Sequence, residues 1–208
     1  MFGRIRVTML AASAAGVLLA VLSSTAHAGL LSLNPGACGL TESQPFAPWG
    51  DYNTYVQVPG GTFEPGSASW ALSGGAKVVS GNESYNASGS YSLSLPAGSS
   101  ATSPGACTGL DHPSARLFVR NTGSSSSRLN VYATYRILLG LPVKVYLGQL
   151  TGSAGWEPSA PVDMGLLNNL AGELTLSQST ISFTFVPADS TGKWQIDDVY
   201  LDPWCRNA

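Results

Sequence analysis

The amino-acid sequence predicts an all-β protein built as an antiparallel β-sandwich or barrel. Apolar and polar residues alternate with a period of two in eight short segments, which is typical of half-buried antiparallel strands. Clusters of Gly, Ser, Pro and Asn separate these segments, and the 208 residues include 24 Gly and 13 Pro. Because no clear helical pattern lies between the segments, the sequence excludes a fold of alternating strands and helices.

The chain begins with the features of a secretory signal peptide. Arg4 and Arg6 precede an apolar stretch from Val7 to Leu22, and Ala26-His27-Ala28 is a small-x-small cleavage pattern. The apolar stretch is short for a transmembrane helix, which needs about 20 residues. We therefore expect residues 1–28 to be removed and the mature protein to be secreted, with no insertion in a membrane.

The mature chain is expected to form one domain with an N-terminal leader. Residues 29–58 are the leader, which we expect to pack on the domain, and residues 59–208 are the sandwich. In chain order the predicted strands are Thr54–Val58, Ala76–Ser80, Ser90–Leu95, Arg116–Asn121, Leu129–Arg136, Val143–Leu150, Thr180–Val186 and Trp194–Leu201. Only Asp163–Leu170 has a pattern that permits a helical turn or two.

Alternation also predicts which side of each strand faces the core, because successive side chains point to opposite faces. The expected core-facing residues are Leu117, Val119, Leu129, Val131, Ala133, Tyr135, Val143, Val145, Leu147, Ile181, Phe183 and Phe185. The opposite side carries Arg116, Phe118, Arg120, Tyr132, Arg136, Lys144 and Tyr146, with Arg128 in a turn nearby.

We interpret this second side as one basic and aromatic face that binds a ligand. Its rings suit stacking against sugars, and its guanidinium groups suit hydroxyls or carboxylates. The predicted ligand-binding residues are Phe118, Tyr132, Tyr146, Arg116, Arg120 and Arg136, together with the loop residue Trp156. The alternative is a solvated sheet face on which rings and long basic side chains cover one another.

Composition excludes several other functions. The net charge is -2 and the pI is about 5.6, so the chain has no basic footprint for nucleic acid. The sequence contains no Gly-x-Ser-x-Gly elbow, phosphate loop or zinc-ligand spacing. We therefore expect a protein that is not an enzyme.

Three cysteines are available for a disulfide in an oxidising compartment. Cys38 and Cys107 both follow a Pro-Gly-Ala sequence in a loop context, and we predict that they pair. Pairing of Cys38 with Cys205 is the alternative.

Two groups of motifs resemble a known family. The segments Pro59-Gly60-Gly61-Thr62-Phe63-Glu64 and Trp70-Ala71-Leu72-Ser73-Gly74-Gly75-Ala76 open the domain, and Trp194-Gln195-Ile196-Asp197-Asp198-Val199 closes it. This pattern resembles the galactose-binding-like jelly-roll carbohydrate-binding modules. The leader motif Pro45-Phe46-Ala47-Pro48-Trp49 is similar to that of a set of secreted actinobacterial proteins.

The resemblance implies a structural calcium ion between the first and last strands. Carried over to this chain, Glu64 and Asp198 supply carboxylates, with Asp197 in reserve. Backbone oxygens near Gly61 and Lys77 complete the shell of hard oxygen ligands that Ca²⁺ takes. The alternative is that these carboxylates are exposed charges that protect an edge strand.

Two functional classes remain. The first is a secreted, non-catalytic binding module whose partner is a polysaccharide or cell-wall glycan. The second is a structural or interaction protein of the cell surface. The sequence leaves the glycan and the oligomeric state open.

Overall fold

The computed structural model describes residues 41–85, 89–108, 114–136, 141–164 and 179–202. All of these residues belong to one compact unit, 33–208. The predicted signal peptide (residues 1–28), Cys38 and Cys205 lie outside the described residues, as does most of the predicted helical turn at 163–170. Within the described ranges, no helix is both long and apolar enough to cross a membrane.

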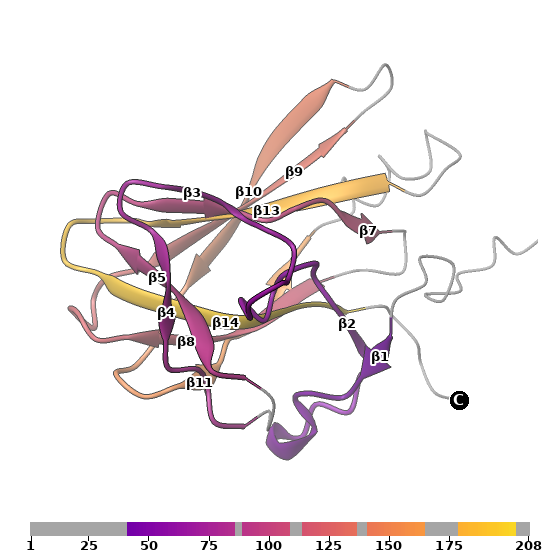
Figure 1. Cartoon of the computed structure of the whole chain (residues 1–208), viewed down its shortest axis with the longest axis horizontal. Helices are drawn as coiled ribbons and strands as arrows, with labels where there is room; N and C mark the ends of the chain where they lie inside the picture. Colours follow the sequence, from indigo (N-terminus) through magenta and orange to yellow (C-terminus); the bar gives the residue numbers. More distant parts are fainter. Residues whose placement is uncertain (1–40, 86–88, 109–113, 137–140, 165–178, 203–208) are drawn as a thin grey trace, which may run out of the picture. The chain divides into compact units, whose positions relative to one another are not determined.

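The described chain forms two antiparallel sheets, which confirms the all-β sandwich (Figure 1). The first sheet contains β1 (Glu42–Ser43), β2 (Tyr55–Gln57), β4 (Lys77–Ser80), β5 (Tyr91–Pro96), β8 (Ser114–Asn121), β11 (Glu157–Pro158), β12 (Val162–Asp163) and β14 (Lys193–Asp202). The second sheet contains β3 (Ala71–Ser73), β6 (Ser100–Thr102), β7 (Ala106–Thr108), β9 (Leu129–Arg136), β10 (Pro142–Leu150) and β13 (Ser179–Pro187). A short 3-10 helix, η2 (Ala47–Trp49), precedes β2.

The eight-stranded sheet is organised around β14. This strand pairs with β8 along one side and with β5 and then β2 along the other. Its register with β8 shifts between Asp197 and Tyr200, and Asp198 there has a left-handed φ of 45°. β4 lies at the far edge, beyond β5.

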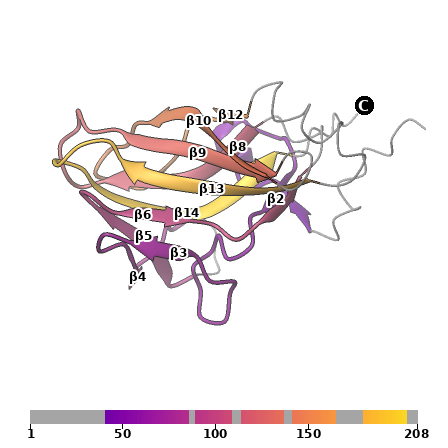
Figure 2. The ribbon, with the colours of Figure 1, turned by 90° about the horizontal axis from the view of Figure 1, so that it is seen from above.

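The six-stranded sheet has the order β10-β9-β13-β6-β3 (Figure 2). In this sheet β7 also pairs with β13, beside β6. β10 and β3 are therefore its edge strands. The chain changes sheet repeatedly, for example from β3 to β4, from β5 to β6 and from β8 to β9. Such crossings between two antiparallel sheets are those of the predicted jelly roll.

All eight strands predicted from the sequence are present, with ends that differ by no more than two residues. The additional strands β1, β3, β6, β7, β11 and β12 are two or three residues long. Segments this short cannot display an alternating pattern, so the sequence did not reveal them.

The core between the sheets contains the residues that alternation predicted. Leu117, Val119 and Phe183 are fully buried, as are Leu129, Val131 and Ala133 of β9, while Tyr135 is buried with 9% of its surface exposed. Val143, Val145 and Leu147 are only half-buried, because β10 is an edge strand. Apolar side chains at every second position therefore hold the two sheets together.

The outer face of the eight-stranded sheet carries a second, smaller aromatic core. Phe46, from the segment before β2, is completely buried, and its ring centroid lies 5.2 Å from that of Phe118 and 5.7 Å from that of Tyr200. Tyr55 closes the cluster, with its ring centroid 4.9 Å from that of Phe46. The described part of the predicted leader thus packs on the sheet, and through β2 it also contributes a strand. The domain boundary at residue 58 stays a prediction.

An ionic contact ties this segment to β8. The Arg116 guanidinium pairs with Asp51, and its Cζ lies 4.5 Å from the ring centroid of Phe46. Its Nε donates a hydrogen bond to the Ser159 carbonyl at 2.8 Å, and the Tyr55 hydroxyl donates to Asp51 at 2.5 Å. Charge, ring and backbone contacts therefore converge on one guanidinium.

The packing of Phe46 gives a stability prediction. Phe46→Ala leaves a cavity between Phe118, Tyr55 and Tyr200, and we expect it to lower the free energy of unfolding by about 3 to 5 kcal/mol. Tyr52→Ala removes a ring that is 69% exposed in the same segment, so a change within about 0.5 kcal/mol is expected. Chemical denaturation of both variants checks this, and equal losses would contradict it.

Candidate functional site

The structure divides the predicted basic and aromatic face between two sheets, which corrects the prediction of a single face. Arg116, Phe118 and Arg120 lie on β8 in the eight-stranded sheet, whereas Tyr132 and Tyr146 lie on β9 and β10 in the six-stranded sheet. Each set points away from the core, as alternation predicted. The outer faces of the two sheets of a sandwich point in opposite directions, so one ligand cannot contact both sets.

The β8 set is covered and does not form an open ligand face. Phe118 is fully buried beneath Phe46, and the ring of Tyr85 stacks on it at 5.7 Å. Its predicted exposure is therefore wrong, although its direction is right. Arg120 donates from Nε to Gln195, and its Cζ lies 4.9 Å from the ring centroid of Trp156. Together with the Arg116 contacts described above, these interactions assign both guanidiniums to structural roles.

The structure places two more residues of the predicted face, Trp156 and Arg128, in contacts within the chain, and it does not describe the side chain of a third, Arg136. Trp156 is half-buried under Arg120, and its carbonyl accepts a hydrogen bond from the Tyr85 hydroxyl at 2.9 Å. Arg128 donates from one nitrogen to the carbonyls of residues 125, 126 and 127, which closes the turn before β9. Arg136 ends β9, and its side chain is outside the described part of the structure.

The outer face of the six-stranded sheet is open and keeps the predicted tyrosines. Tyr146 on β10 pairs directly with Tyr132 on β9, and their ring centroids are 5.4 Å apart with the planes tilted by 58°. Tyr146 is 52% exposed. The Nζ of Lys144 lies 4.5 Å from the centroid of the Tyr132 ring, so an ammonium group borders the pair. We call Tyr132, Lys144 and Tyr146 the tyrosine platform.

A bulge in β10 shapes the platform. The register passes from the pair Tyr146–Tyr132 to the pair Gly148–Val131, so Leu147 is an extra residue. Gly148 has φ 146°, a conformation that L side chains rarely adopt. After the bulge the alternation is inverted, and Gln149 faces outward and donates a hydrogen bond to Asn130 at 2.9 Å.

Hydroxyl groups continue this face toward the other edge of the sheet. Thr184 on β13 pairs with Tyr132 on one side and Thr102 on the other, and the two threonine hydroxyls share a hydrogen bond of 2.9 Å. Ser100 and Ser73 do the same at 2.8 Å between β6 and β3. The Ser/Thr alternation of β13 was visible in the sequence, whereas β3 and β6 were too short to be recognised.

The charge of this face is low. The six strands of the sheet contain no Asp or Glu, and Lys144 is the basic residue whose side chain the structure describes in them. Retaining and inverting glycosidases need two carboxyl groups flanking the bond. The strands of this face therefore supply a surface of rings, hydroxyls and amides, and no pair of acids.

The predicted calcium ligands are engaged in other contacts. Glu64 Oε1 accepts hydrogen bonds from the backbone N–H groups of Ser90 and Tyr91, at 2.6 and 2.9 Å. Asp198 Oδ1 accepts from the Gln57 amide at 3.0 Å, and the Gly61 carbonyl accepts from Val199 at 3.3 Å.

Lys77 belongs to the β4–β5 ladder, opposite Ser94. N–H groups directed at the oxygens that a cation would need oppose its binding. Among the described residues, no group of three or more His, Cys, Asp or Glu side chains could hold a metal ion. This donor set does not fit the predicted calcium ion.

Asp197 is buried next to other acids. Its Oδ2 accepts from the backbone N–H of Glu83 at 3.2 Å, and its Oδ1 accepts from that of Asp198 at 2.9 Å. Burial first, and then the charge of Asp198, raise the pKa of Asp197 to about 8. This carboxyl group is therefore largely protonated at neutral pH in the folded protein.

Cys107 on β7 is disulfide-bonded. Both possible partners, Cys38 and Cys205, lie outside the described residues, so the predicted pairing stays a prediction.

No protein-family model and no curated protein matches the chain. Among solved structures, it is similar to the CBM22-1 xylan-binding domain of Paenibacillus barcinonensis Xyn10C, with 12% identity over 72% of this chain and 94% of that one and a TM-score of 0.47. The CBM22-1–GH10 modules of Clostridium thermocellum Xyn10B, complexed with xylohexaose, give 13% identity over 73% and 28%, with a TM-score of 0.48. The family 11 carbohydrate-binding module of Clostridium thermocellum Lic26A-Cel5E gives 11% identity over 72% and 94%, with a TM-score of 0.40.

At this level of similarity the comparisons bear on neither the ligand nor the residues that would bind it. The predicted relationship to secreted actinobacterial proteins stays a prediction.

The pKa of Asp197 predicts a pH dependence of stability. The unfolded chain releases this proton near pH 4, whereas the folded chain keeps it until about pH 8. The group thus contributes stability that is full below pH 4 and is lost as the pH rises toward 8, at no more than about 1.4 kcal/mol per pH unit. Asp197→Asn cannot ionise, so its free energy of unfolding should fall less steeply than that of the wild type between pH 5 and 8.

Asp189→Asn is the matched control for this measurement. Hydrogen bonds from Thr191 hold the pKa of Asp189 below its usual value, so its titration lies outside this pH range. Denaturation curves at several pH values should then show the wild-type slope for this variant. Parallel slopes for Asp197→Asn and the wild type would contradict the prediction.

The hydrogen bonds at Glu64 predict a response to chelation. Because Ser90 and Tyr91 donate to this carboxylate, we expect the same melting temperature in EDTA and in millimolar calcium chloride. Differential scanning calorimetry measures this directly. A melting temperature that falls on chelation would support the calcium ion implied by the family resemblance and would reject our interpretation of the donor set.

Proposed function

We propose that the protein is a secreted, non-catalytic module that binds a neutral polysaccharide through the outer face of its six-stranded sheet. The observation that carries this proposal is the tyrosine platform, in which an exposed ring at Tyr146 lies beside Tyr132 at one end of a hydroxyl-lined face.

The platform matches the amphipathic chemistry of a sugar ring. One side of a pyranose ring presents C–H groups, which pack against an aromatic face, while its edge presents hydroxyls that both donate and accept hydrogen bonds. Tyr146 offers the exposed ring, and Lys144 offers an ammonium donor within 4.5 Å of the neighbouring ring centroid. Beyond the platform, Thr102, Ser100 and Ser73 carry hydroxyls that are half-buried or exposed along the same face, whereas Thr184 between them and Tyr132 is buried.

The electrostatics of the face favour an uncharged ligand. Lys144 is a single positive charge whose side chain already contacts the Tyr132 ring, and no Arg cluster of the kind that binds anions remains on this face among the described side chains. Two of the guanidiniums that first suggested an acidic ligand, Arg116 and Arg120, belong to the covered side of the other sheet, and Arg136 at the end of β9 has its side chain outside the described part of the structure. A neutral glycan is therefore preferred over a uronate or phosphate polymer.

Two further features support the wider proposal. The absence of Asp and Glu from the six strands favours binding over hydrolysis. The disulfide at Cys107 is typical of an oxidising compartment, and it agrees with the signal peptide predicted for residues 1–28.

Substitution of the platform tests the proposal. Tyr146→Ala removes the exposed ring and should weaken retention on insoluble xylan, cellulose, mannan or chitin at least tenfold for whichever polymer retains the wild type. Tyr132→Ala should have a similar effect, because it removes the second ring and the contact of Lys144. Depletion isotherms on each polymer provide the measurement.

Tyr52→Ala serves as the control, since it removes an exposed tyrosine on the segment that covers the other sheet. It should bind like the wild type. Unchanged retention of the platform variants would reject the site. A wild-type protein that no polymer retains, but that self-associates in analytical ultracentrifugation, would favour a structural or interaction role at the cell surface.

A further inference from the structure

The sandwich is open at one edge, between β3 and β4. These consecutive strands are the edges of different sheets. Leu72 on β3 pairs with buried Ala101, and Val78 on β4 pairs with buried Leu93, so both side chains point between the sheets. Even so, Leu72 is 38% exposed and Val78 is 43% exposed. No further strand covers the core here within the described residues.

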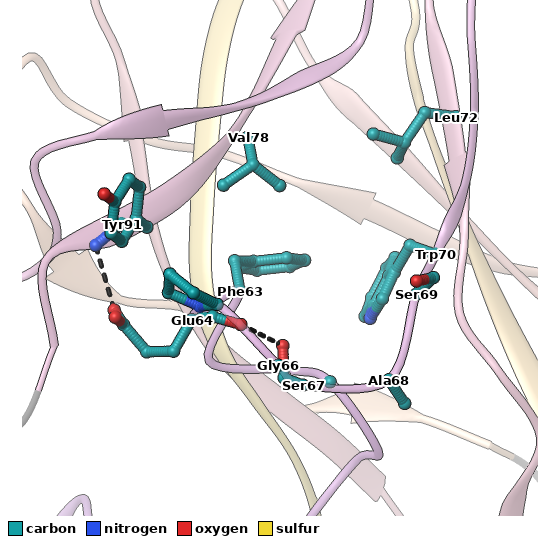
Figure 3. Close-up of a pocket in the computed structure, with 12 residues that line it drawn as sticks. Phe63, Glu64, Gly66, Ser67, Ala68, Ser69, Trp70, Leu72, Val78 and Tyr91 are labelled. Atoms are coloured by element: carbon teal, nitrogen blue, oxygen red, sulfur yellow. Dashed lines mark hydrogen bonds between the residues drawn. The ribbon is translucent and has the colours of Figure 1, made fainter.

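A pocket of about 410 Å³ occupies this opening. Figure 3 shows Phe63 at its centre, with Tyr91 on one side and Trp70 on the other, while Val78 and Leu72 project from the strands opposite. This volume lies within the range of small-ligand sites in proteins. We call this site the edge pocket.

The loop that forms the edge pocket is held in a strained, tightly closed shape. Phe63 has a left-handed φ of 55°, which is unfavourable for a residue with a bulky side chain. At Gly60, a Cβ atom would lie 2.0 Å from the Ala68 carbonyl oxygen, so the loop closes only with glycine there. Backbone strain of this kind persists where the surroundings enforce it, and it concentrates at ligand sites.

Trp70, one of the aromatic residues that line the edge pocket, has a hydrogen-bond donor without a partner among the described residues. The Trp70 ring stacks on Phe185 at 6.0 Å and lies 5.0 Å from the Phe63 ring. Its buried Nε1 has no hydrogen-bond partner in the described part of the chain. A buried donor without a partner is costly, so the wall of the pocket carries an unfavourable polar group.

The lining favours a neutral, hydroxylated ligand. No Lys, Arg or His is among the described residues that line the pocket, and Glu64 is its one charged residue. Since a carboxylate repels anions, this lining disfavours phosphates and uronates. The hydroxyl of Ser69 lies beside the rings, and that of Ser67, which donates to the Glu64 carbonyl at 2.6 Å, can still accept a hydrogen bond from a ligand.

The edge pocket lies at the end of the candidate binding face. One row of directly paired residues crosses the six-stranded sheet from Tyr146 through Tyr132, Thr184 and Thr102 to Ala71. Ala71 stands between Trp70 and Leu72, two residues of the pocket wall. The row spans four strand spacings, about 19 Å, and ends at Ala71 on the outer side of β3, whereas Leu72 points to the inner side, so a glycan on the face reaches the pocket by turning around this edge strand.

We propose that the edge pocket binds one neutral sugar ring, the terminal residue of a glycan whose other residues lie on the sheet face. The rings of Trp70 and Tyr91 contact the C–H face of this sugar, and the serine hydroxyls and Glu64 contact its hydroxyls. The placement of the remaining sugars rests on the function proposed above, whereas the pocket itself does not.

Filling the pocket from its rim tests the proposal. Val78→Trp places an indole in the opening without removing any core side chain, and Leu72→Trp does so from the other strand. Val79→Trp is the matched control, because the same change on the neighbouring residue points to the opposite face of β4. The probes are xylose, glucose and mannose and their linear hexasaccharides, titrated by calorimetry, with melting curves to verify folding.

We expect both pocket-filling variants to weaken hexasaccharide binding at least tenfold and to abolish monosaccharide binding, while Val79→Trp stays within twofold of the wild type. Hexasaccharide affinities that are unchanged in Val78→Trp and Leu72→Trp would overturn the proposal. If only Tyr146→Ala lost binding, the proposed function of the sheet face would be supported and the pocket proposal rejected. If only the pocket-filling variants lost binding, the pocket proposal would be supported and the binding role of the sheet face rejected. Choline is the competing cationic probe. If choline bound saturably, if Val78→Trp abolished that binding, and if no sugar bound, the assignment of the pocket to a sugar would be wrong.

Discussion

The structure depends on burial of β14 on both of its faces. Ile196 points into the core between the sheets, while Tyr200 packs beneath Phe46 on the outer side. A strand with two covered faces needs hydrogen-bonded neighbours on both edges, and β14 has β8 along one edge and β5 and β2 along the other. The segment before β2 is therefore part of what stabilises the sheet, and Arg116 holds it there through Asp51.

This arrangement assigns different roles to the two outer faces. The eight-stranded sheet uses its aromatic and basic side chains internally, because Phe118 and Arg116 meet residues of the same chain. The six-stranded sheet has no such cover among the described residues, and its outward positions include tyrosine, threonine, serine, asparagine and glutamine together with Lys144. The same residue types that looked alike in the sequence thus serve stability on one sheet and remain available to a ligand on the other.

The sequence predicted the architecture and half of the candidate site. There are physical reasons why the other half could not be predicted. A period of two reports which side of a strand a residue occupies, so the inward direction of Val131 and the outward direction of Phe118 were both correct. It does not report which sheet a strand joins, and β8 and β9 separate at the turn that Arg128 closes. The bulge at Leu147 also inverted the alternation, which hid Gln149. The edge pocket depends on the left-handed conformation of Phe63 and on the exposure of Leu72 and Val78 at two sheet edges. Neither feature produces a recognisable pattern in the sequence.

The bulge in β10 has a consequence for how molecules behave when they are crowded together. An open edge strand can recruit the edge of another molecule and start an aggregate. β10 begins with Pro142, which lacks an N–H donor, carries exposed Lys144, and loses its regular spacing at Leu147. Each of these features makes the strand a poor template for a neighbouring copy. The β10 edge therefore resists pairing with the same edge of a neighbouring copy.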